Sequence, residues 1–262
     1  MARILTGVQS TGTPHLGNII GAVLPAIEMA KNEQNQSFLF IADFHSLTQI
    51  KDHSTLRKNT FETASTWLAF GLNPNKTIFY KQSDVSEVTE LAWYLSCFFP
   101  FKRLTLAHSF KDKSANLKDI NTGLFSYPML MAADILLYDA DIVPVGKDQL
   151  QHIEMTRDVA SRFNNTYGET LIVPSSLIDT SIKFVPGTDG NKMSKSKNNL
   201  INVFLEKEKL KKQIMGIKTD SKNINEPKDF SSCTIFNLYK ILAEKKDIEK
   251  LKNKYSKGNI GY

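Results

Sequence analysis

Short apolar runs alternate along the first two-thirds of the chain with longer segments of helical period. The clearest run, SFLFIA at 37–42, ends at Asp43 and is typical of a strand buried on both faces of a parallel sheet. The same patterns predict strands at 3–8, 77–80 and 142–146 and helices at 18–31, 56–70, 85–99, 123–139 and 148–163. Pro25 should bend the first of these helices and Asp148 should cap the last.

Strands that alternate with helices predict an α/β fold with a mostly parallel sheet. In such a sheet the loops after residues 8, 42 and 145 come together at the carboxyl ends of the strands, where ligands bind. A ligand site is therefore expected at this edge.

Basic residues are concentrated in the last part of the chain. Residues 192–262 contain 17 lysines and 8 acidic residues, a net charge of +9, whereas the whole chain has a net charge of +6. A basic segment on a slightly acidic body favours a polyanionic partner such as RNA or DNA. Solvated helix faces in a lysine-rich chain would produce the same composition, so charge alone leaves both interpretations open.

Composition narrows the class of protein. The chain has 262 residues, of which 41% are hydrophobic, enough for one large domain or for one with a smaller second domain. Cys97 and Cys233 form no C-x-x-C motif, which argues against a disulfide framework or a cysteine zinc site and favours a reducing cytoplasm. The amino terminus lacks the apolar stretch of a secretory signal. The most apolar later stretch is interrupted by Asp134, Asp139 and Asp141, so no membrane span is expected.

The loop TPHLGN at 13–18 follows the first expected strand and leads into the first expected helix. Gly12 and Gly17 would let a ligand approach the backbone closely, and Asn18 can cap the helix. The helix N-terminus would then offer exposed N–H groups to a phosphate, with His15 as a further donor, most strongly when protonated. An ordinary turn with a capping residue and a solvated histidine explains the same letters, because short motifs have many chance matches.

A second loop, GTDGNKMSKS at 187–196, marks the change to the lysine-rich helical part. Its glycines would let the loop move, and Lys192 and Lys195 could hold a polyphosphate while charge develops in phosphoryl or nucleotidyl transfer. A solvated run of charges is the alternative. Both loops together, one at each end of an α/β domain, favour a nucleotide site over two unrelated turns.

Three side chains share one face of the helix expected at 123–139. Tyr127, Met131 and Asp134 have the spacing i, i+4, i+7. A carboxylate on so apolar a face is costly unless it has a partner. An indole N–H is one such partner, and methionine and tyrosine would enclose an aromatic ring. A lysine or arginine partner, or a role as the cap of a neighbouring segment, is an equal alternative from spacing alone.

The two loops, taken as HLGN at 15–18 and KMSKS at 192–196, resemble the signature motifs of class I aminoacyl-tRNA synthetases. The stretches GVQSTGTPHLGNIIGA, YPMLMAADILLYDADIVPVGKDQLQHIEMTRDVASRFN and NKMSKS are similar to the bacterial tryptophanyl-tRNA synthetases, and the similarity covers essentially the whole chain. The middle stretch is the most specific, because tyrosyl enzymes are built differently there.

The resemblance implies two domains. A Rossmann-like parallel-sheet catalytic domain that binds ATP and tryptophan is expected at 1–190, and the KMSKS loop with the start of a small all-helical anticodon-binding domain at 191–262. Because members of the family continue well past this point, the helical domain is expected to be shortened at its carboxyl end.

The resemblance also implies which residues bind the substrates. Asp134 would accept the indole N–H of tryptophan. The other residues implied to bind the amino acid are Gly7, Gln9, His45, Tyr127, Met131, Val143, Val145 and Gln149. Those implied to bind ATP are Gln9, Ser10, Thr11, Gly17, Asn18, Gly146, Lys147, Asp148, Ile182, Lys192, Met193, Ser194, Lys195 and Ser196. Those implied to be catalytic are His15, Asn18, Lys192 and Lys195.

The implied reaction needs no catalytic base, because the carboxylate of tryptophan is ionised at neutral pH and attacks the α-phosphate of ATP itself. Catalysis would come from positioning and from charge neutralisation by His15, Lys192, Lys195 and Mg²⁺, with no metal ligand from protein side chains. The implied partners are L-tryptophan, ATP, tRNA(Trp) and a second copy in a homodimer, for which the apolar segment 91–101 is a candidate interface. That segment would serve equally as plain core.

Two other functions fit parts of the sequence. A non-catalytic RNA-binding paralogue of the same fold would explain the basic segment and a shortened helical domain, and it predicts RNA binding without pyrophosphate exchange. A small-molecule nucleotidyltransferase would explain the His-x-Gly loop but neither the second loop nor the helix face with Asp134.

Overall fold

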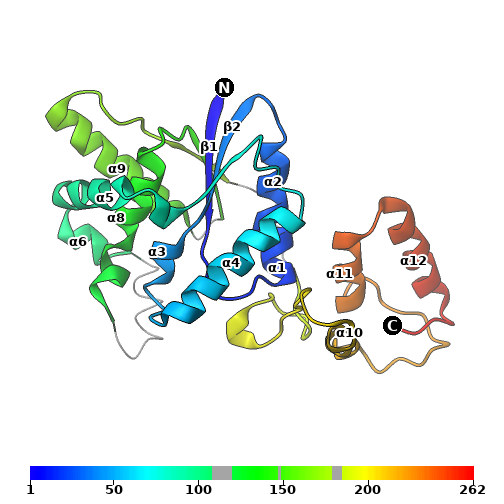
Figure 1. Ribbon diagram of the computed structural model, residues 1–262. Helices are drawn as coiled ribbons and strands as arrows, with labels where there is room; N and C mark the ends of the chain where they lie inside the picture. The colour runs from blue at the N-terminus through cyan, green and yellow to red at the C-terminus, as the bar shows by residue number, and fades with distance from the viewer. Residues whose placement is uncertain (108–119, 147–148, 179–184) are drawn as a thin grey trace. The chain divides into compact units, whose positions relative to one another are not determined.

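The computed structural model describes residues 1–107, 120–146, 149–178 and 185–262 (Figure 1). The chain forms two compact units. The first contains residues 1–13 and 22–182, and the second contains residues 14–21 and 183–262. The short segment at the start of the first expected helix therefore belongs to the same unit as the lysine-rich part of the chain.

The first unit is built on a sheet of five parallel strands in the order β3-β2-β1-β4-β5. The strands are β1 Ala2–Val8, β2 Asn35–Ile41, β3 Ile78–Lys81, β4 Ile142–Val145 and β5 Ser175–Ile178. The expected parallel α/β fold is confirmed. In β2 the last five residues are all buried, as a strand covered on both faces requires. Strand β5 has no counterpart among the strands expected from the sequence.

The order of the strands locates the ligand-binding edge of this sheet. From β1 the chain passes to β2 on one side, whereas β4 pairs with β1 on the other side. The loops that leave β1 and β4 therefore diverge at a switch point, which is where open α/β sheets bind ligands. Residues from Gln9 onward and Gly146 stand directly after these strands.

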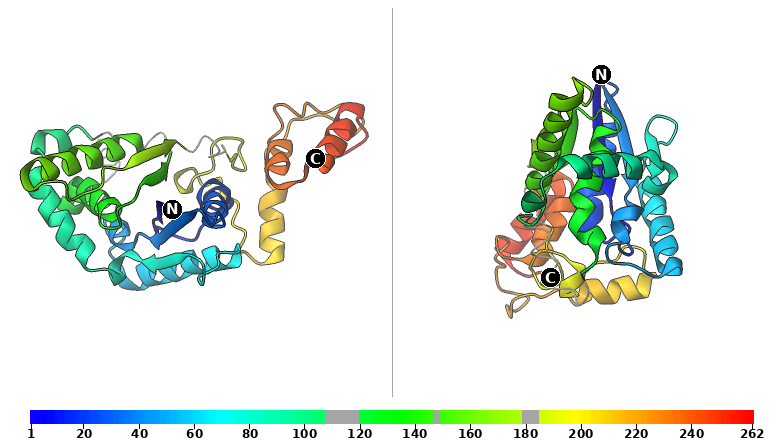
Figure 2. Two further views of the ribbon diagram at one scale, coloured as in Figure 1. Left: turned by 90° about the horizontal axis from the view of Figure 1, so that it is seen from above. Right: turned by 90° about the vertical axis from the view of Figure 1, so that its left-hand side faces the viewer.

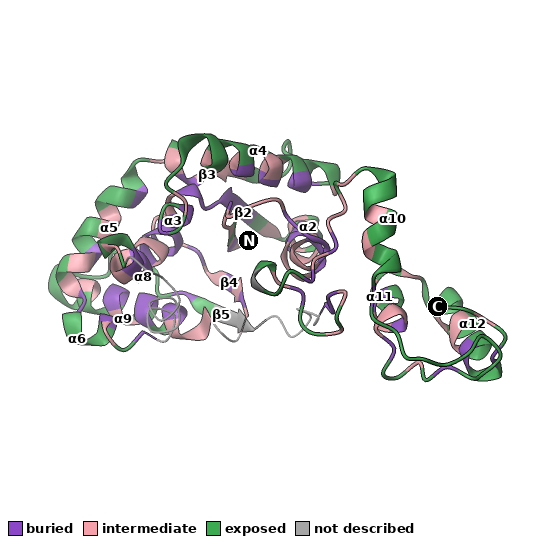
Figure 3. Cartoon of the chain, turned by 90° about the horizontal axis from the view of Figure 1, so that it is seen from below, coloured by how far each residue is buried: buried purple, intermediate pink, exposed green. Residues whose placement is uncertain are grey.

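Helices cover the sheet and form most of the core of the first unit (Figure 2). They are α2 Leu24–Ala30, α3 Asp43–Ser46, α4 His53–Ala69, α5 Glu87–Phe98, α6 Phe101–Leu104, α8 Thr122–Leu136 and α9 Leu150–Tyr167, with a 3-10 turn at Gln82–Asp84. Helix α8 packs against both α5 and α9, and most of its residues are buried (Figure 3). This explains why its sequence is apolar on nearly every face, so that a carboxylate there stands out.

The second unit contains α1 Leu16–Asn18, a 3-10 turn at Lys195–Lys197, α10 Lys207–Met215, α11 Thr234–Leu242 and α12 Lys245–Lys257. Its small core joins Cys233, Phe236 and Tyr255. Helix α10 buries no residue, and its surface is exposed along its length (Figure 3). The expected helical region after the second loop is confirmed.

The expected helix at 18–31 is present, but its hydrogen-bond pattern changes within it. A π-helix, Ile19–Val23, separates α1 from α2, and Pro25 lies in the first turn of α2. Proline has no N–H to donate to the preceding turn, so the hydrogen-bond pattern changes before it. The disturbance expected at Pro25 thus takes the form of a π-helical turn on its amino-terminal side.

The remaining expectations concern the cap of α9, the two cysteines and membrane-spanning helices. Helix α9 begins at Leu150, and its expected cap, Asp148, lies outside the described residues. Cys97 is exposed, Cys233 is buried, and both are free thiols. Among the described residues no helix has the length and apolar character needed to cross a membrane.

Candidate active site

The first group of expected site residues lies on α8, in the first unit. Tyr127 and Asp134 are buried and Met131 is half-buried, packed against a cluster that contains Val143 and Val145. Asp134 keeps only 3% of its surface exposed. The expected face of the helix is therefore present, and its carboxylate is in the interior.

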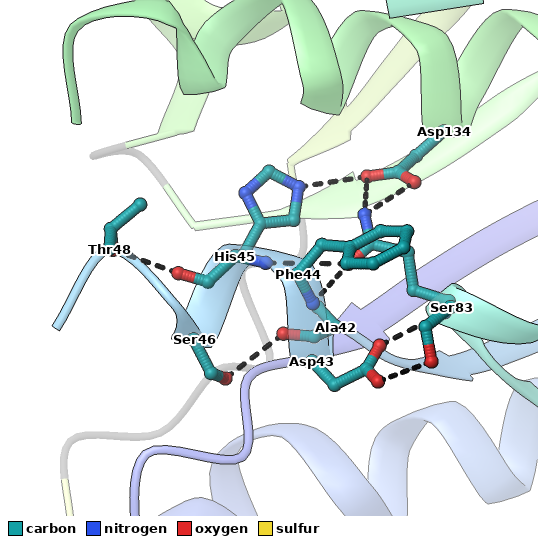
Figure 4. Close-up of polar contacts among 9 residues, drawn as sticks. Ala42, Asp43, Phe44, His45, Ser46, Thr48, Ser83 and Asp134 are labelled. Atoms are coloured by element: carbon teal, nitrogen blue, oxygen red, sulfur yellow. Dashed lines mark hydrogen bonds and ion pairs between the residues drawn. The ribbon is translucent and has the colours of Figure 1, made fainter. Parts of the chain in front are cut away.

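Asp134 has two partners among the described residues, and neither is a lysine or an arginine. The Nε2 atom of His45 lies 2.9 Å from its Oδ2 atom (Figure 4). The Nε2 of Gln82 donates to both carboxylate oxygens, at 2.8 Å to Oδ1 and 3.0 Å to Oδ2. Within the described residues, the alternative of a lysine or arginine partner finds no support. Burial raises the pKa of Asp134, and the hydrogen bonds from His45 and Gln82 act against that increase.

Tyr127 is held by a second histidine. Its hydroxyl lies 2.8 Å from Nε2 of His152, a buried residue of α9. The ring of Tyr127 meets the rings of His45 and His152 edge to face, with centroids 6.0 Å and 5.2 Å apart. The structure therefore brings together Asp134, His45 and Tyr127, three of the residues expected at the amino acid.

The expected floor of the amino-acid pocket comes from β1 and β4. Val143 and Val145 are buried in one cluster with Phe40. A side chain at Gly7 would meet the ring of Phe40 at 2.3 Å, so only glycine fits beneath that ring. Gly7 is thus required by its neighbour on β2, whatever ligand binds.

The loop after β1 is fastened to α3. Ser10 is fully buried; its N–H donates to Oγ of Ser46 at 2.9 Å, and the two hydroxyls lie 3.1 Å apart. Thr60 donates to the hydroxyl of Ser10 at 3.2 Å. Gln9 and Thr11 on either side are half-buried. The hydroxyl of Ser10 is therefore engaged by the protein.

The loop after β4 is described in part. Gly146 and Gln149 are half-buried, and the N–H of Gln149 donates to the carbonyl of Gly146 at 3.0 Å. The expected ATP-binding residues Lys147, Asp148 and Ile182 lie outside the described residues.

The second group of expected site residues lies in the second unit, around α1. His15, not Asn18, is the N-cap of α1. The backbone N–H of His15 donates to Oδ1 of Asn18 at 3.2 Å, and the N–H of Asn18 donates to the carbonyl of His15 at 2.8 Å. Asn18 therefore supports the helix start from its third position, which corrects the expected cap.

The first N–H groups of α1 are not exposed to a ligand in this conformation, contrary to expectation. The N–H of Leu16 donates to the carbonyl of Ile201 at 2.9 Å. The N–H of Gly17 donates to Sδ of Met193 at 3.3 Å. The two loops of the sequence analysis thus meet, although the contact joins residues 176 positions apart.

His15 is neutral at neutral pH. Burial, together with the positive charge of Lys195, lowers the pKa of His15 to about 4. The stronger donation that a protonated His15 would give is therefore absent at neutral pH in this conformation. Within the described part of the chain, its buried Nδ1 atom has no hydrogen-bond partner.

The loop that carries Lys192 and Lys195 has a defined backbone. Pro186 and Lys192 form an antiparallel bridge, and the N–H of Met193 donates to the carbonyl of Val185 at 2.9 Å. Met193 is buried, Ser194 is half-buried and both lysines are exposed. Ser196 lies in the 3-10 turn that follows. The loop therefore presents its charges outward and its methionine inward.

Asn199 holds this loop from the inside. It is 1% exposed; its Oδ1 accepts the N–H of Ser194 at 2.8 Å, and its Nδ2 donates to Asp189 at 2.7 Å and to the carbonyl of Lys192 at 3.1 Å. A side chain at Gly187 would meet Asn199 at 2.4 Å.

Gln82, His152 and Asn199 are among the buried polar residues that the sequence did not identify. Each is polar in a position that the fold buries, and each binds an expected site residue or its loop. Gln82 follows a strand at the expected ligand edge, which is a sequence signal that could have identified it. His152 and Asn199 carry no such signal.

The described residues contain no group of three or more histidine, cysteine, aspartate or glutamate side chains that could hold a metal ion. An octahedral Mg²⁺ is commonly held by substrate phosphates and water instead.

Comparison with known proteins agrees with this arrangement. The family described as tRNA synthetases class I (W and Y) matches residues 1–262. The tryptophan–tRNA ligase of Campylobacter jejuni strain RM1221 is 45% identical over 260 residues, which cover 99% of this chain and 81% of that protein. The tryptophan–tRNA ligase of Rhodopirellula baltica is 47% identical over 261 residues, again 99% of this chain and 81% of that protein.

A solved structure gives the same result. The crystal structure of the tryptophanyl-tRNA synthetase from Campylobacter jejuni in complex with ADP and tryptophan matches with a TM-score of 0.94 at 45% identity, over 99% of this chain and 81% of that one. Sequence motifs, strand order and these similarities lead to one conclusion: the chain belongs to the class I tRNA synthetases of the tryptophan and tyrosine group.

Proposed function

We propose that this protein is a tryptophan–tRNA ligase. It joins L-tryptophan to ATP to form tryptophanyl-AMP and pyrophosphate, and then transfers the tryptophan to tRNA(Trp). The observation that carries this function is Asp134, a carboxylate buried in an apolar helix and held by His45 and Gln82. The relatives with 45% and 47% identity are tryptophan–tRNA ligases, which supports the same substrate here.

Asp134 selects the amino acid. The indole N–H of tryptophan donates to this carboxylate, whereas phenylalanine would leave it without that donor. A site built around a buried acceptor rejects a ligand that lacks the donor more strongly than apolar contacts alone. Tyr127, Met131, Val143, Val145 and Gly7 form the walls around the ring, and Gln9 and Gln149 bind the amino and carboxylate groups.

The phosphates of ATP bind the residues of the second group. Lys192 and Lys195 neutralise charge on the polyphosphate, and His15 acts as a hydrogen-bond donor. Asn18, Gly17, Met193, Ser194 and Ser196 complete the loops on either side. The loop after β1 with Ser10 and Thr11, and the loop after β4 with Gly146, Lys147, Asp148 and Ile182, bind the nucleoside.

The chemistry proceeds in two displacements. A carboxylate oxygen of tryptophan forms a bond to the α-phosphorus of ATP, and the bond from that phosphorus to the bridging oxygen breaks, so that pyrophosphate leaves. A ribose hydroxyl at the end of the tRNA then attacks the carbonyl carbon of the adenylate, and AMP leaves. Neither step requires a protein nucleophile, because positioning and charge neutralisation supply the catalysis.

ATP and Mg²⁺ are the proposed cofactors. The relative of known structure with ADP and tryptophan supports ATP as the nucleotide. Because the described residues contain no metal-binding group of their own, Mg²⁺ comes with the phosphates of ATP.

The lysine-rich segment 192–262 binds the tRNA. Its net charge of +9 and helix α10, which buries no residue, suit a phosphate backbone. We place the catalytic domain at 1–190 and the anticodon-binding part at 191–262, and the cytoplasm, where free thiols persist, is the proposed location.

The proposed assembly is a homodimer. Trp93 and Phe101 keep 71% and 69% of their surfaces exposed, on α5 and α6. Large aromatic side chains this exposed are typical of protein–protein interfaces. The interface therefore includes the segment 91–101.

ATP–pyrophosphate exchange with tryptophan, tyrosine and phenylalanine in parallel tests the function. We expect exchange with tryptophan alone, and its loss in Asp134→Ala. Exchange with tyrosine would move the chain to the sister branch of the family. A folded protein that binds RNA but exchanges with none of the three would be a non-catalytic relative.

A further inference from the structure

Gln82 is a buried glutamine with no solvent-facing role. It follows β3 in the 3-10 turn Gln82–Asp84 and keeps 1% of its surface exposed. Its Oε1 accepts the backbone N–H of Phe44 at 3.1 Å and of His45 at 3.4 Å, in the first turn of α3. Its Nε2 donates to both oxygens of Asp134. Two N–H donors on one side and a carboxylate on the other define which end of the amide is oxygen.

The two carboxylate oxygens of Asp134 accept different numbers of hydrogen bonds. Oδ2 accepts hydrogen bonds from His45 and Gln82, whereas Oδ1 accepts one from Gln82 alone among the described residues. An ionised carboxylate oxygen can accept two hydrogen bonds. Oδ1 therefore retains a place for one more donor, and Oδ2 is filled.

We propose that Gln82 is a positioning residue for amino-acid specificity: it fixes the carboxylate of Asp134 so that Oδ1 accepts the indole N–H. This inference rests on the proposed function. Gln82 itself touches no substrate, because both ends of its amide are engaged by the protein. It links the backbone of α3 to the carboxylate that binds the indole N–H.

The geometry explains why two donors are needed. A carboxylate held at one oxygen still turns about its last bond, whereas a donor bridging both oxygens restrains that rotation. His45 binds only Oδ2. Without Gln82 the carboxylate would rotate about that single contact, and Oδ1 would no longer be held in a fixed orientation toward the indole N–H.

The turn that carries Gln82 is itself anchored. The N–H and hydroxyl of Ser83 donate to Asp43 at 3.0 Å and 2.6 Å (Figure 4). Adjacent residues thus divide two tasks: Ser83 fastens the turn to α3, and Gln82 connects α3 to Asp134. Ser83→Ala is therefore a matched control, since it disturbs the same turn without touching Asp134.

The test compares two amino acids in pyrophosphate exchange. One is tryptophan, and the other is benzothienylalanine, in which a sulfur atom replaces the indole N–H. In Gln82→Met, which keeps the length and volume but removes all four hydrogen bonds of the amide, we expect the KM for tryptophan to rise roughly tenfold. The KM values for benzothienylalanine and ATP should change less than about twofold, within the range of a surface substitution. The preference for tryptophan over its analogue then falls by the same factor.

Ser83→Ala should keep the wild-type preference. Thermal denaturation identifies which variants remain folded, and Gln82→Asn, whose shorter amide does not reach Asp134 from the same backbone, gives a second reading with the same expected outcome. Equal losses for both amino acids, or an unchanged preference in a folded Gln82 variant, would overturn the inference. Absence of exchange in the wild type would instead reject the proposed function, so the two failures are distinct.

Discussion

The amide of Gly17 donates a hydrogen bond to the sulfur of Met193 at 3.3 Å. Gly17 lies in the first turn of α1, and Met193 is the buried residue of the loop with Lys192 and Lys195. An N–H group that donates its hydrogen bond to a thioether does not donate to a phosphate at the same time. The structure therefore shows the helix start closed by the loop that the sequence associates with it, and a ligand that uses this amide must displace the methionine.

Replacement of the sulfur should loosen this contact. Met193→Leu keeps the apolar packing but removes the acceptor, so the amide proton of Gly17 should exchange roughly three- to tenfold faster, as expected for the loss of one weak hydrogen bond. Amide hydrogen exchange followed by NMR measures the rate. Met129→Leu, at a fully buried position in α8, is the control and should leave Gly17 unchanged. Equal protection of Gly17 in wild type and Met193→Leu would show that the sulfur contact contributes nothing.

His15 should make the protein less stable in acid. Its pKa is about 4 in the folded chain and 6.5 in an unfolded one, so between these values the unfolded state takes up the proton first. The folded state is therefore destabilised as pH falls from about 6.5 to about 4, and His15 has no such effect at higher pH. The loss should amount to roughly 1–3 kcal/mol.

Urea denaturation over this pH range, compared between wild type and His15→Gln, isolates the contribution of this residue. The variant has no titrating group at position 15, so its stability should decline less steeply in acid. Parallel pH profiles for the two proteins would contradict the neutral, buried state of His15.

Asn199 should matter for ATP and not for tryptophan. Asn199→Ala removes two hydrogen bonds to the loop backbone, at Lys192 and Ser194, and one to the side chain of Asp189. The buried groups left without partners destabilise the loop by about 1–3 kcal/mol, so the KM for ATP should rise roughly fivefold or more.

Exchange kinetics measure the effect on ATP, and calorimetry measures tryptophan binding, which should be unchanged because Asp134 and its partners lie in the first unit. Asn225→Ala, at an exposed position of the second unit, is the matched control. A parallel loss of tryptophan affinity would contradict the separation of the two groups.

A charge on α5 should break the dimer. Trp93→Glu places a carboxylate at the centre of the proposed interface, where an unpaired charge costs several kcal/mol if it is buried (roughly 3–5). Analytical ultracentrifugation should show a dimer for the wild type and a monomer for the variant. Ser65→Glu, at an exposed position on α4, is the control and should remain dimeric. A monomeric wild type would remove the interface altogether.

The parallel sheet could be predicted because a strand buried on both faces has a recognisable local sequence pattern. The segment 37–42 has no polar alternation, which a strand with one solvated face would show. Strand β5, SSLI, contains two serines in four residues, and no apolar run marks it. It becomes a strand because β4 offers paired backbone groups beside it, which is a tertiary effect.

The start of α1 shows the limit of local rules. Asparagine is a preferred residue at the N-cap, which predicts Asn18 at that position. The helix begins three residues earlier, with His15 as the cap and Asn18 bonded back to its N–H. The carbonyl of Ile201 and the sulfur of Met193 accept the N–H groups of Leu16 and Gly17, and both acceptors come from distant sequence.

The sequence by itself determined the α/β class, the two motif loops, and the presence of one carboxylate on an apolar helix face. These features depend on residues close together in the chain, whose periodicity and chemistry can be assessed directly. The tertiary structure alone decided the partners of Asp134, since His45 and Gln82 lie 89 and 52 positions away from it. It also decided that His15 is neutral, because burial and the charge of Lys195 set its pKa. Distance in space, not distance along the chain, governs desolvation and hydrogen bonding, and only the folded chain defines it.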